Sequence, residues 1–317
     1  DPWNGAADLN ERVLRTVGEP AERFAEDLLR VLRALRFAGQ FDLTIEAETW
    51  QALLAAVPDT NQLSPERIQE EVMKVLAQAR RPSVALRLYA ESGVFGELYP
   101  ELETGFLAEL GQLLRACDFV PLVRPLVRLS LLFALASATD GQTDASENGN
   151  SSKRTIESLM ERLRFSNADT KRVAGVAGSL FSFPPSEEPP ILRRWLHRIG
   201  PEHFADISRA WIARARVHAS PDTASVENGS PSEVLRRISA LRSILREGPA
   251  LTIADLALDG SDLQELGLSP GPRFGEILRF LLEEVLERPE VNNRADLIAL
   301  AKQGGLIPTD VPAPPET

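Results

Sequence analysis

The sequence predicts an all-α fold made of several helical units. Apolar residues recur at helical spacing along most of the 317 residues, and runs of alternating β-branched residues, which indicate strands, are scarce. Helix start signals are also clear. Ser64-Pro65-Glu66 supplies a capping hydroxyl, a proline at the first helical position and an acidic first turn. We therefore expect helices almost throughout.

Two further helices are predicted in the last third of the chain. Pro272 begins a helical pattern that Pro289 ends, because proline suits the first turn of a helix but interrupts its interior. Asn293 is placed to cap another helix, and Gly304 is placed to end it.

Low-complexity stretches divide the chain. Residues 138–152 and 219–232 are small, polar and rich in Gly, Ser, Asn and Asp, which is typical of flexible loops. The predicted organisation is a short first segment at 1–16, helical units at 17–92, 93–218 and 233–306, a linker at 219–232 and a disordered end at 307–317.

Composition narrows the class of protein. No apolar run is long enough to span a membrane, and the single cysteine, Cys117, has no partner for an internal disulfide. We expect a reducing, cytoplasmic location. The net charge of −11 arises mostly from residues 221–317, which hold 9 basic and 16 acidic residues. A basic RNA-binding surface is therefore compatible with the first two thirds of the chain.

The most informative segment is predicted to be one amphipathic helix over residues 23–37. Its apolar residues gather on one face of a helical wheel and its arginines on the other, with Asp27 one turn before Arg30. A solvated basic face with no further role is one interpretation. The apolar face comprises Phe24, Leu28, Val31, Leu32, Leu35 and Ala38, and the basic face comprises Arg30, Arg33 and Arg36.

A family resemblance supports a functional interpretation. Residues 26–38 read EDxxRxxRAxRFA and resemble the neck-helix motif of class II CCA-adding tRNA nucleotidyltransferases and bacterial poly(A) polymerases. Residues 1–18 are similar to the family's segment between head and neck, residues 63–71 to its next neck motif, and residues 262–278 to its tail. These blocks follow the family order and span most of the chain.

The resemblance implies an elongated neck-body-tail array. Residues 17–92 would be the neck, which recognises the nucleotide base; 93–218 the RNA-binding body; and 233–306 the tRNA-binding tail. Residues 1–16 would end an α/β nucleotidyltransferase head, whose Asp-x-Asp carboxylates hold catalytic magnesium ions. The sequence contains no Asp-x-Asp and does not begin with Met. We therefore expect a fragment that lacks its head and is inactive alone.

The implied function is tRNA 3′-end processing. The complete enzyme would add CCA to tRNA from CTP and ATP, with tRNA and nucleoside triphosphates as its partners. An A-adding enzyme or a poly(A) polymerase shares the neck motif and stays an alternative. A headless RNA-binding protein without catalysis is an alternative of another class.

Base choice has a chemical rationale. C and A both present an exocyclic amine donor beside a ring-nitrogen acceptor, whereas G and U present the reverse. A carboxylate only accepts hydrogen bonds and a guanidinium only donates them, so an Asp beside an Arg suits C and A. On a continuous helix, residues i and i+3 lie side by side. The resemblance assigns base reading to Asp27 and Arg30, completion of the site or phosphate binding to Arg33 and Arg36, and supporting roles to Arg15, Glu26 and Arg67.

Basic clusters further along the chain are candidate tRNA contacts. No metal site is predicted, because the three histidines and one cysteine lack the spacing of metal ligands. The clusters are Arg124/Arg128, Lys153/Arg154, Lys171/Arg172, Arg193/Arg194/Arg198 and Arg214/Arg216.

Overall fold

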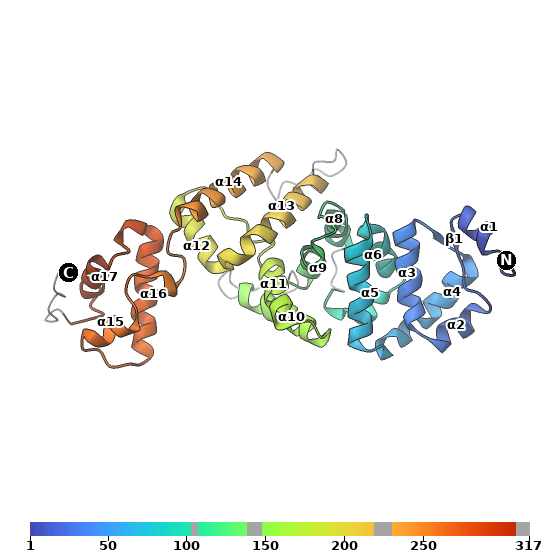
Figure 1. Cartoon of the computed structure of the whole chain (residues 1–317), viewed down its shortest axis with the longest axis horizontal. Coiled ribbons are helices and arrows are strands. Elements are labelled where there is room, and N and C mark those ends of the chain that lie inside the picture. The colour runs from blue at the N-terminus through green and yellow to red at the C-terminus, as the bar shows by residue number, and fades with distance from the viewer. Residues whose placement is uncertain (103–106, 138–147, 219–229, 309–317) are drawn as a thin grey trace. The chain divides into compact units, whose positions relative to one another are not determined.

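The computed structural model describes residues 1–102, 107–137, 148–218 and 230–308. Helices dominate these residues, so the predicted all-α class is confirmed (Figure 1). The chain forms two compact units. The first comprises Asp1–Phe183 with Ala205–Val234, and the second comprises Pro184–Phe204 with Leu235–Thr317. The elongated arrangement and the missing head stay predictions.

The N-terminal segment of the first unit combines one short helix with the two strands found in the described residues. Helix α1 (Gly5–Asn10) buries none of its residues, and the Asp1 carboxylate accepts hydrogen bonds from its first amides. Strand β1 (Val13–Leu14) pairs in parallel with β2 (Thr44–Ile45). The sequence pattern did not predict this small sheet, since two residues are too few to show alternation.

The predicted continuous helix over residues 23–37 is wrong. Helix α2 (Pro20–Glu26) ends at Asp27, whose backbone is extended at φ −154° and ψ 102°, and α3 (Leu29–Phe41) begins two residues later. The Asp27 carboxylate accepts a hydrogen bond from the amide of Leu29. Aspartate favours such capping positions because its oxygen satisfies an amide that has no partner within the helix. The break therefore comes from the capping chemistry of Asp27.

Helix α3 packs within a cluster of neighbouring helices (Figure 1). It contacts α5 (Pro65–Gln78), which starts at the predicted proline, and α6 (Pro82–Glu91). Gly39 allows the close approach of α3 and α6, because an added Cβ would overlap the backbone of Ala85. Helix α4 (Ala47–Ala56) packs on α2, and the 3₁₀ helix η1 (Val57–Gln62) follows it.

The rest of the first unit is a stack of short helices. The predicted loop over 138–152 is wrong at its end, since α10 begins at Asn148; residues 138–147 lie outside the described part of the chain. The elements are α7 (Val94–Leu98), η2 (Pro100–Leu102), α8 (Leu107–Asp118), α9 (Pro125–Phe133), η3 (Ala134–Ser137), α10 (Asn148–Arg162), α11 (Asn167–Gly178) and α13 (Phe204–His218).

The second unit is a smaller helical cluster. As predicted, α16 (Pro272–Glu287) starts at Pro272 and ends before Pro289, and Asn293 caps α17 (Arg294–Gln303) by accepting from the Asp296 amide. The other elements are α12 (Pro189–Ile199), η4 (Pro201–His203), most of α14 (Pro231–Glu247), η5 (Ile253–Asp255), α15 (Gly260–Glu265) and η6 (Pro289–Val291).

The boundary between these units differs from the predicted boundary between residues 93–218 and 233–306. Residues 184–204 group with the second unit because α12 packs on α16. The buried Arg193 of α12 donates hydrogen bonds to the carbonyls of Leu286 and Glu287 at the end of α16, at 2.6 and 2.7 Å. Most of the predicted linker (219–229) and of the predicted disordered end (309–317) lies outside the described residues. The neck, body and tail roles stay predictions.

Among the described helices, none combines the length and the apolar character that a membrane crossing requires. The cytoplasmic location stays a prediction.

Candidate nucleotide and RNA site

The break between α2 and α3 fixes the Asp27 side chain. Its Oδ1 accepts from the Leu29 amide at 3.1 Å and from Nη2 of Arg67, on α5, at 2.8 Å. Burial raises the pKa of Asp27, but these two hydrogen bonds, together with the charges of Arg67 and Arg33, hold the pKa below its usual value. The second oxygen, Oδ2, accepts no hydrogen bond from the described residues. Asp27 therefore presents an ionised acceptor in one orientation.

Arg30 is held by a different carboxylate. Its Nη1 donates to Glu26 at 2.8 Å and to the carbonyl of Arg23 at 3.1 Å. Arg23 donates to the same Glu26 at 2.8 Å. The hydrogen bond from Arg30 is the main reason that the pKa of Glu26 is lowered. All three side chains are exposed enough for solvent to screen these ion pairs.

A buried carboxylate organises the next turns of α3. Glu71 of α5 is fully buried and accepts from Nε of Arg36 at 2.8 Å and from Lys74 at 3.1 Å, with Arg33 Nε at 3.5 Å. Burial raises the pKa of Glu71, but the hydrogen bonds from Arg36 and Lys74 and the nearby charges hold it below its usual value. The Arg36 side chain is only 8% exposed, whereas that of Arg33 is 46% exposed.

The structure brings most of the predicted site residues together, but not in the predicted pairing. Asp27 and Arg30 do not lie side by side on one helix; within the described residues, each is bonded to another partner. Arg36 does not lie on an exposed basic face, because Glu71 draws it into the interface between α3 and α5. Arg15 makes a separate ion pair with Asp8 at 2.9 Å. The functional roles of these residues stay predictions.

Glu71, Lys74 and Arg23 also belong to this cluster, and sequence reasoning assigned none of them to the site. A signal for Glu71 was present. It occupies a position in the apolar stripe of α5, beside Ile68 and Val72. A carboxylate at a buried helix position needs a cationic or hydrogen-bonding partner, and that requirement points to a neighbouring arginine.

Several arginines of the predicted tRNA-binding clusters are structural. Arg128 is 1% exposed, and its guanidinium donates to the carbonyls of Leu76 and Ala79 at the end of α5 and to that of Val120. Arg193 caps α16 in the same manner. These two residues were wrongly predicted as RNA contacts, because a guanidinium can satisfy helix-terminal carbonyls as well as phosphates.

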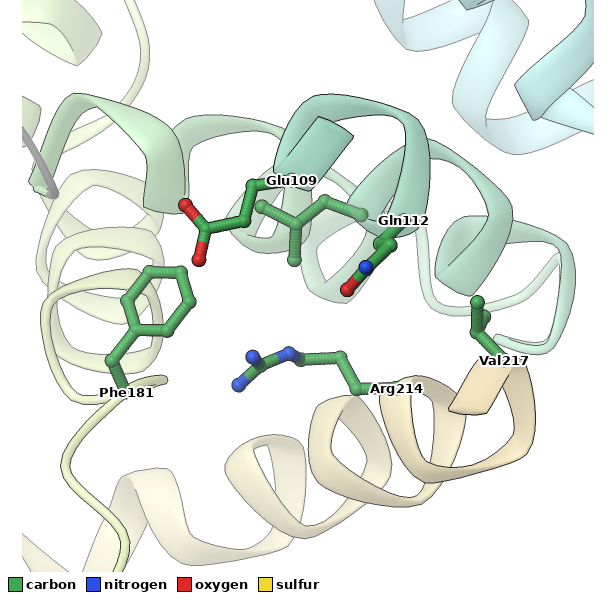
Figure 2. A pocket seen from close by; sticks show the side chains of 6 residues that line it. Glu109, Gln112, Phe181, Arg214 and Val217 are labelled. Carbon is green, nitrogen blue, oxygen red and sulfur yellow. The ribbon is translucent and has the colours of Figure 1, made fainter. Parts of the chain in front are cut away.

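Arg214 is a third buried arginine. Figure 2 shows its side chain in a small pocket with Phe181, Glu109 and Gln112. The guanidinium carbon lies 4.7 Å from the centre of the Phe181 ring, and burial lowers the pKa of Arg214 to about 10. Arg216, two residues further along α13, is exposed. Within this predicted cluster, only Arg216 is well placed to reach a phosphate.

The described residues do not fit a magnesium site. Across the part of the chain that the structure describes, no three His, Cys, Asp or Glu side chains gather in a way that would hold a metal ion. We therefore assign no metal chemistry to these residues.

A family model matches part of the first unit. Residues 42–106 match a family described as "Probable RNA and SrmB- binding site of polymerase A". The match covers η1 and α4 to α7, directly after the arginine-bearing helix α3.

Several similar curated proteins are CCA-adding enzymes. The enzyme of Staphylococcus haemolyticus is 24% identical over 313 residues, which is 96% of this chain and 67% of that protein. The enzyme of Staphylococcus epidermidis is 45% identical over 76 residues, 24% of this chain and 19% of that protein. The chain thus spans between about a fifth and two thirds of the length of these curated relatives.

Solved structures agree on the fold. The CCA-adding enzyme of Bacillus stearothermophilus in complex with CTP has a TM-score of 0.65 at 23% identity, over 96% of this chain and 69% of that one. The Thermotoga maritima CCA-adding enzyme complexed with tRNA has a TM-score of 0.53 at 17% identity, over 95% and 66%. The resemblance seen in the sequence is therefore confirmed: this chain is similar to CCA-adding enzymes along most of its length.

Proposed function

We propose that this chain is the nucleotide-selecting and RNA-binding part of an enzyme that adds CCA to the 3′ end of tRNA. The observation that carries the proposal is the fixed, ionised carboxylate of Asp27 among the arginines of α3 and α5. The similarity to CCA-adding enzymes supports the reaction, and two similar structures, one in complex with CTP and one with tRNA, support these ligands.

Base selection follows from the free oxygen of Asp27. Oδ2 accepts from the exocyclic amine that C and A share, and it faces a carbonyl lone pair when G or U is present. Arg30 supplies the donor for the ring nitrogen after it leaves Glu26, and the half-exposed Arg33 binds the phosphates. A mismatched base leaves buried polar groups unpaired, which is the source of strong discrimination.

The catalytic metal ions belong, in this proposal, to an α/β head outside this sequence. The similar proteins are longer than this chain, and the described residues do not fit a metal ion. We expect the chain to bind tRNA and nucleotides without extending the RNA. An A-adding enzyme or a poly(A) polymerase is the second candidate, because the matching family description refers to polymerase A.

Substituting Asp27→Asn tests the site directly. In Asp27→Asn the Leu29 amide and Arg67 hold the amide oxygen, which leaves the NH₂ group, a donor, at the position of Oδ2. The preference for C and A should therefore be lost or reversed while the size of the side chain is kept. Saturation-transfer NMR of the full chain with CTP, ATP, UTP and GTP measures this preference even when binding is weak. The matched control is Asp59→Asn, an exposed aspartate on η1.

The wild type and Asp59→Asn should bind CTP and ATP at least several-fold more tightly than UTP and GTP, and Asp27→Asn should lose or reverse this preference. An unchanged preference in Asp27→Asn would remove Asp27 from base reading.

A further inference from the structure

One exposed face of α3 carries two arginines followed by two phenylalanines. Arg30, Arg33, Phe37 and Phe41 recur at spacings of three or four residues, so they lie along a single helix face. We call these four residues the α3 stripe. The Arg30 and Arg33 side chains are 40% and 46% exposed, and Phe37 and Phe41 are 37% and 53% exposed.

The two rings of the stripe form a preassembled aromatic surface. Their centroids lie 5.9 Å apart with an angle of 27° between the ring planes. The guanidinium carbon of Arg36 lies 4.2 Å from the centre of the Phe37 ring. That contact and the stacking limit the conformational freedom of the Phe37 side chain. A ligand that binds to the ring therefore costs little further loss of side-chain entropy.

The surroundings of the rings are basic. Arg12 donates from Nη1 to the backbone carbonyl of Phe41 at 3.1 Å, which places another guanidinium at the C-terminal end of α3. Arg33 lies one turn before Phe37 on the same face. The next carboxylate along the chain, Asp42, follows the end of α3 in a left-handed conformation and is not on the stripe.

Exposed aromatic rings within a basic surface match the chemistry of unpaired nucleic acid. Bases stack on aromatic side chains whatever their sequence, and arginines neutralise the phosphates between them. Paired bases are stacked within a duplex and cannot use such rings. We infer that the α3 stripe binds the unpaired 3′ end of the RNA substrate, with its last bases stacked on Phe37 and Phe41. This inference rests on the proposed function, and it lies outside residues 42–106, where the matched RNA-binding family lies.

The position of the stripe relates the RNA end to the nucleotide site. Arg33 lies between the base-reading segment and Phe37, about one helical turn from each. An RNA end on the rings therefore lies next to a nucleotide held by Asp27 and Arg30. The stripe adds a primer-binding surface to a site so far defined only by the incoming nucleotide.

A cycle of protein and RNA changes tests the stacking. The probes are an RNA hairpin with three unpaired 3′ nucleotides and the same hairpin with abasic sugars at those three positions, both carrying a fluorophore in the loop. Fluorescence anisotropy at low salt measures their binding to the full wild-type chain and to the double variant Phe37→Leu/Phe41→Leu. Phe119→Leu is the matched control, since Phe119 is 44% exposed and follows α8 rather than α3. Thermal melts check the folding of each variant.

The wild type and Phe119→Leu should bind the intact hairpin about tenfold more tightly than the abasic one, as expected for base–aromatic stacking. The double variant should bind both hairpins alike, at the affinity of the abasic complex. A tenfold preference that survives in the double variant would overturn the inference, as would a wild type that does not distinguish the two hairpins. If the wild type binds neither hairpin, the proposed RNA function itself fails. If light scattering shows a dimer that the double variant abolishes without any change in hairpin affinity, the stripe is a protein contact instead.

Discussion

Glu71 should be the single most important charged residue for the stability of the α3–α5 pair. Replacing it with Gln removes the charge opposite Arg36, whose side chain is almost completely buried. Removing one partner of a buried ion pair typically costs about 3–5 kcal/mol, because the remaining charge is left uncompensated. Arg33 and Lys74 are partly exposed, so their lost contacts add little. We therefore expect Glu71→Gln to lower the free energy of unfolding by roughly 3 kcal/mol.

Glu70→Gln is the matched control. Glu70 is the neighbouring residue, its side chain is 65% exposed, and among the described residues it pairs with Lys74. An exposed pair of this type contributes about 0.3–0.5 kcal/mol. Urea unfolding followed by circular dichroism compares the two variants with the wild type. A loss below about 1 kcal/mol for Glu71→Gln would show that the Arg36 guanidinium does not depend on this carboxylate.

The same variant has a pH signature. Because the pKa of Glu71 is lowered in the folded chain, its stabilisation is fully present above the unfolded pKa of about 4.3 and is lost as the pH falls through the lower folded value. Glu71→Gln should therefore lose less stability than the wild type on acidification from pH 5. Equal acid sensitivity of the two proteins would contradict the assigned direction of the shift.

Three further predictions concern packing, RNA contacts and a buried arginine. Gly39→Ala should destabilise the fold by about 1–3 kcal/mol in thermal melts, because the new methyl group overlaps Ala85. The control Gly111→Ala has no neighbouring atom near the added methyl group, so it should be neutral or slightly stabilising. Lys153→Gln/Arg154→Gln, on the exposed side of α10, should weaken RNA binding and lower its log–log salt slope by roughly one per lost phosphate contact. Arg128→Met should instead lower the melting temperature, since three carbonyls lose their donor. Thermal unfolding measures this loss of stability, and anisotropy titrations at two salt concentrations measure the loss of RNA binding in the Lys153/Arg154 variant.

The helices were predictable where local chemistry decides their ends. Pro65, Pro272 and Asn293 each begin or cap a helix as expected, because the rigid proline ring and the capping amide act through neighbouring residues alone. The apolar periodicity likewise predicted the helical class. These signals need no knowledge of the rest of the fold.

The break at Asp27 and the burial of Arg36 were not predictable in the same manner. A helical wheel places Asp27 and Arg30 together, but the Asp27 carboxylate also competes for the amide of Leu29 and for the distant Arg67. Arg36 is buried because Glu71, 35 residues away, meets it across the packed helices. Arg128 is buried because the end of α5 presents carbonyls that need donors. The burial of Arg36 and Arg128 depends on residues far along the chain, which periodicity does not reveal. The break at Asp27 combines a local capping bond with a bond to the distant Arg67.

The break at Asp27 links the proposed base selection to the fold. In a continuous helix the carboxylate would sample several rotamers, and a bound base would have to order it at an entropic cost. At the break, Oδ1 is already fixed by the Leu29 amide and by Arg67, so Oδ2 is positioned in advance. Arg67 lies one turn before Glu71 on α5, and Glu71 joins α5 to α3 through Arg36. The supporting residues thus control the geometry of the proposed reader, and changes to Arg67 or Glu71 should affect which base is chosen as well as how stable the fold is.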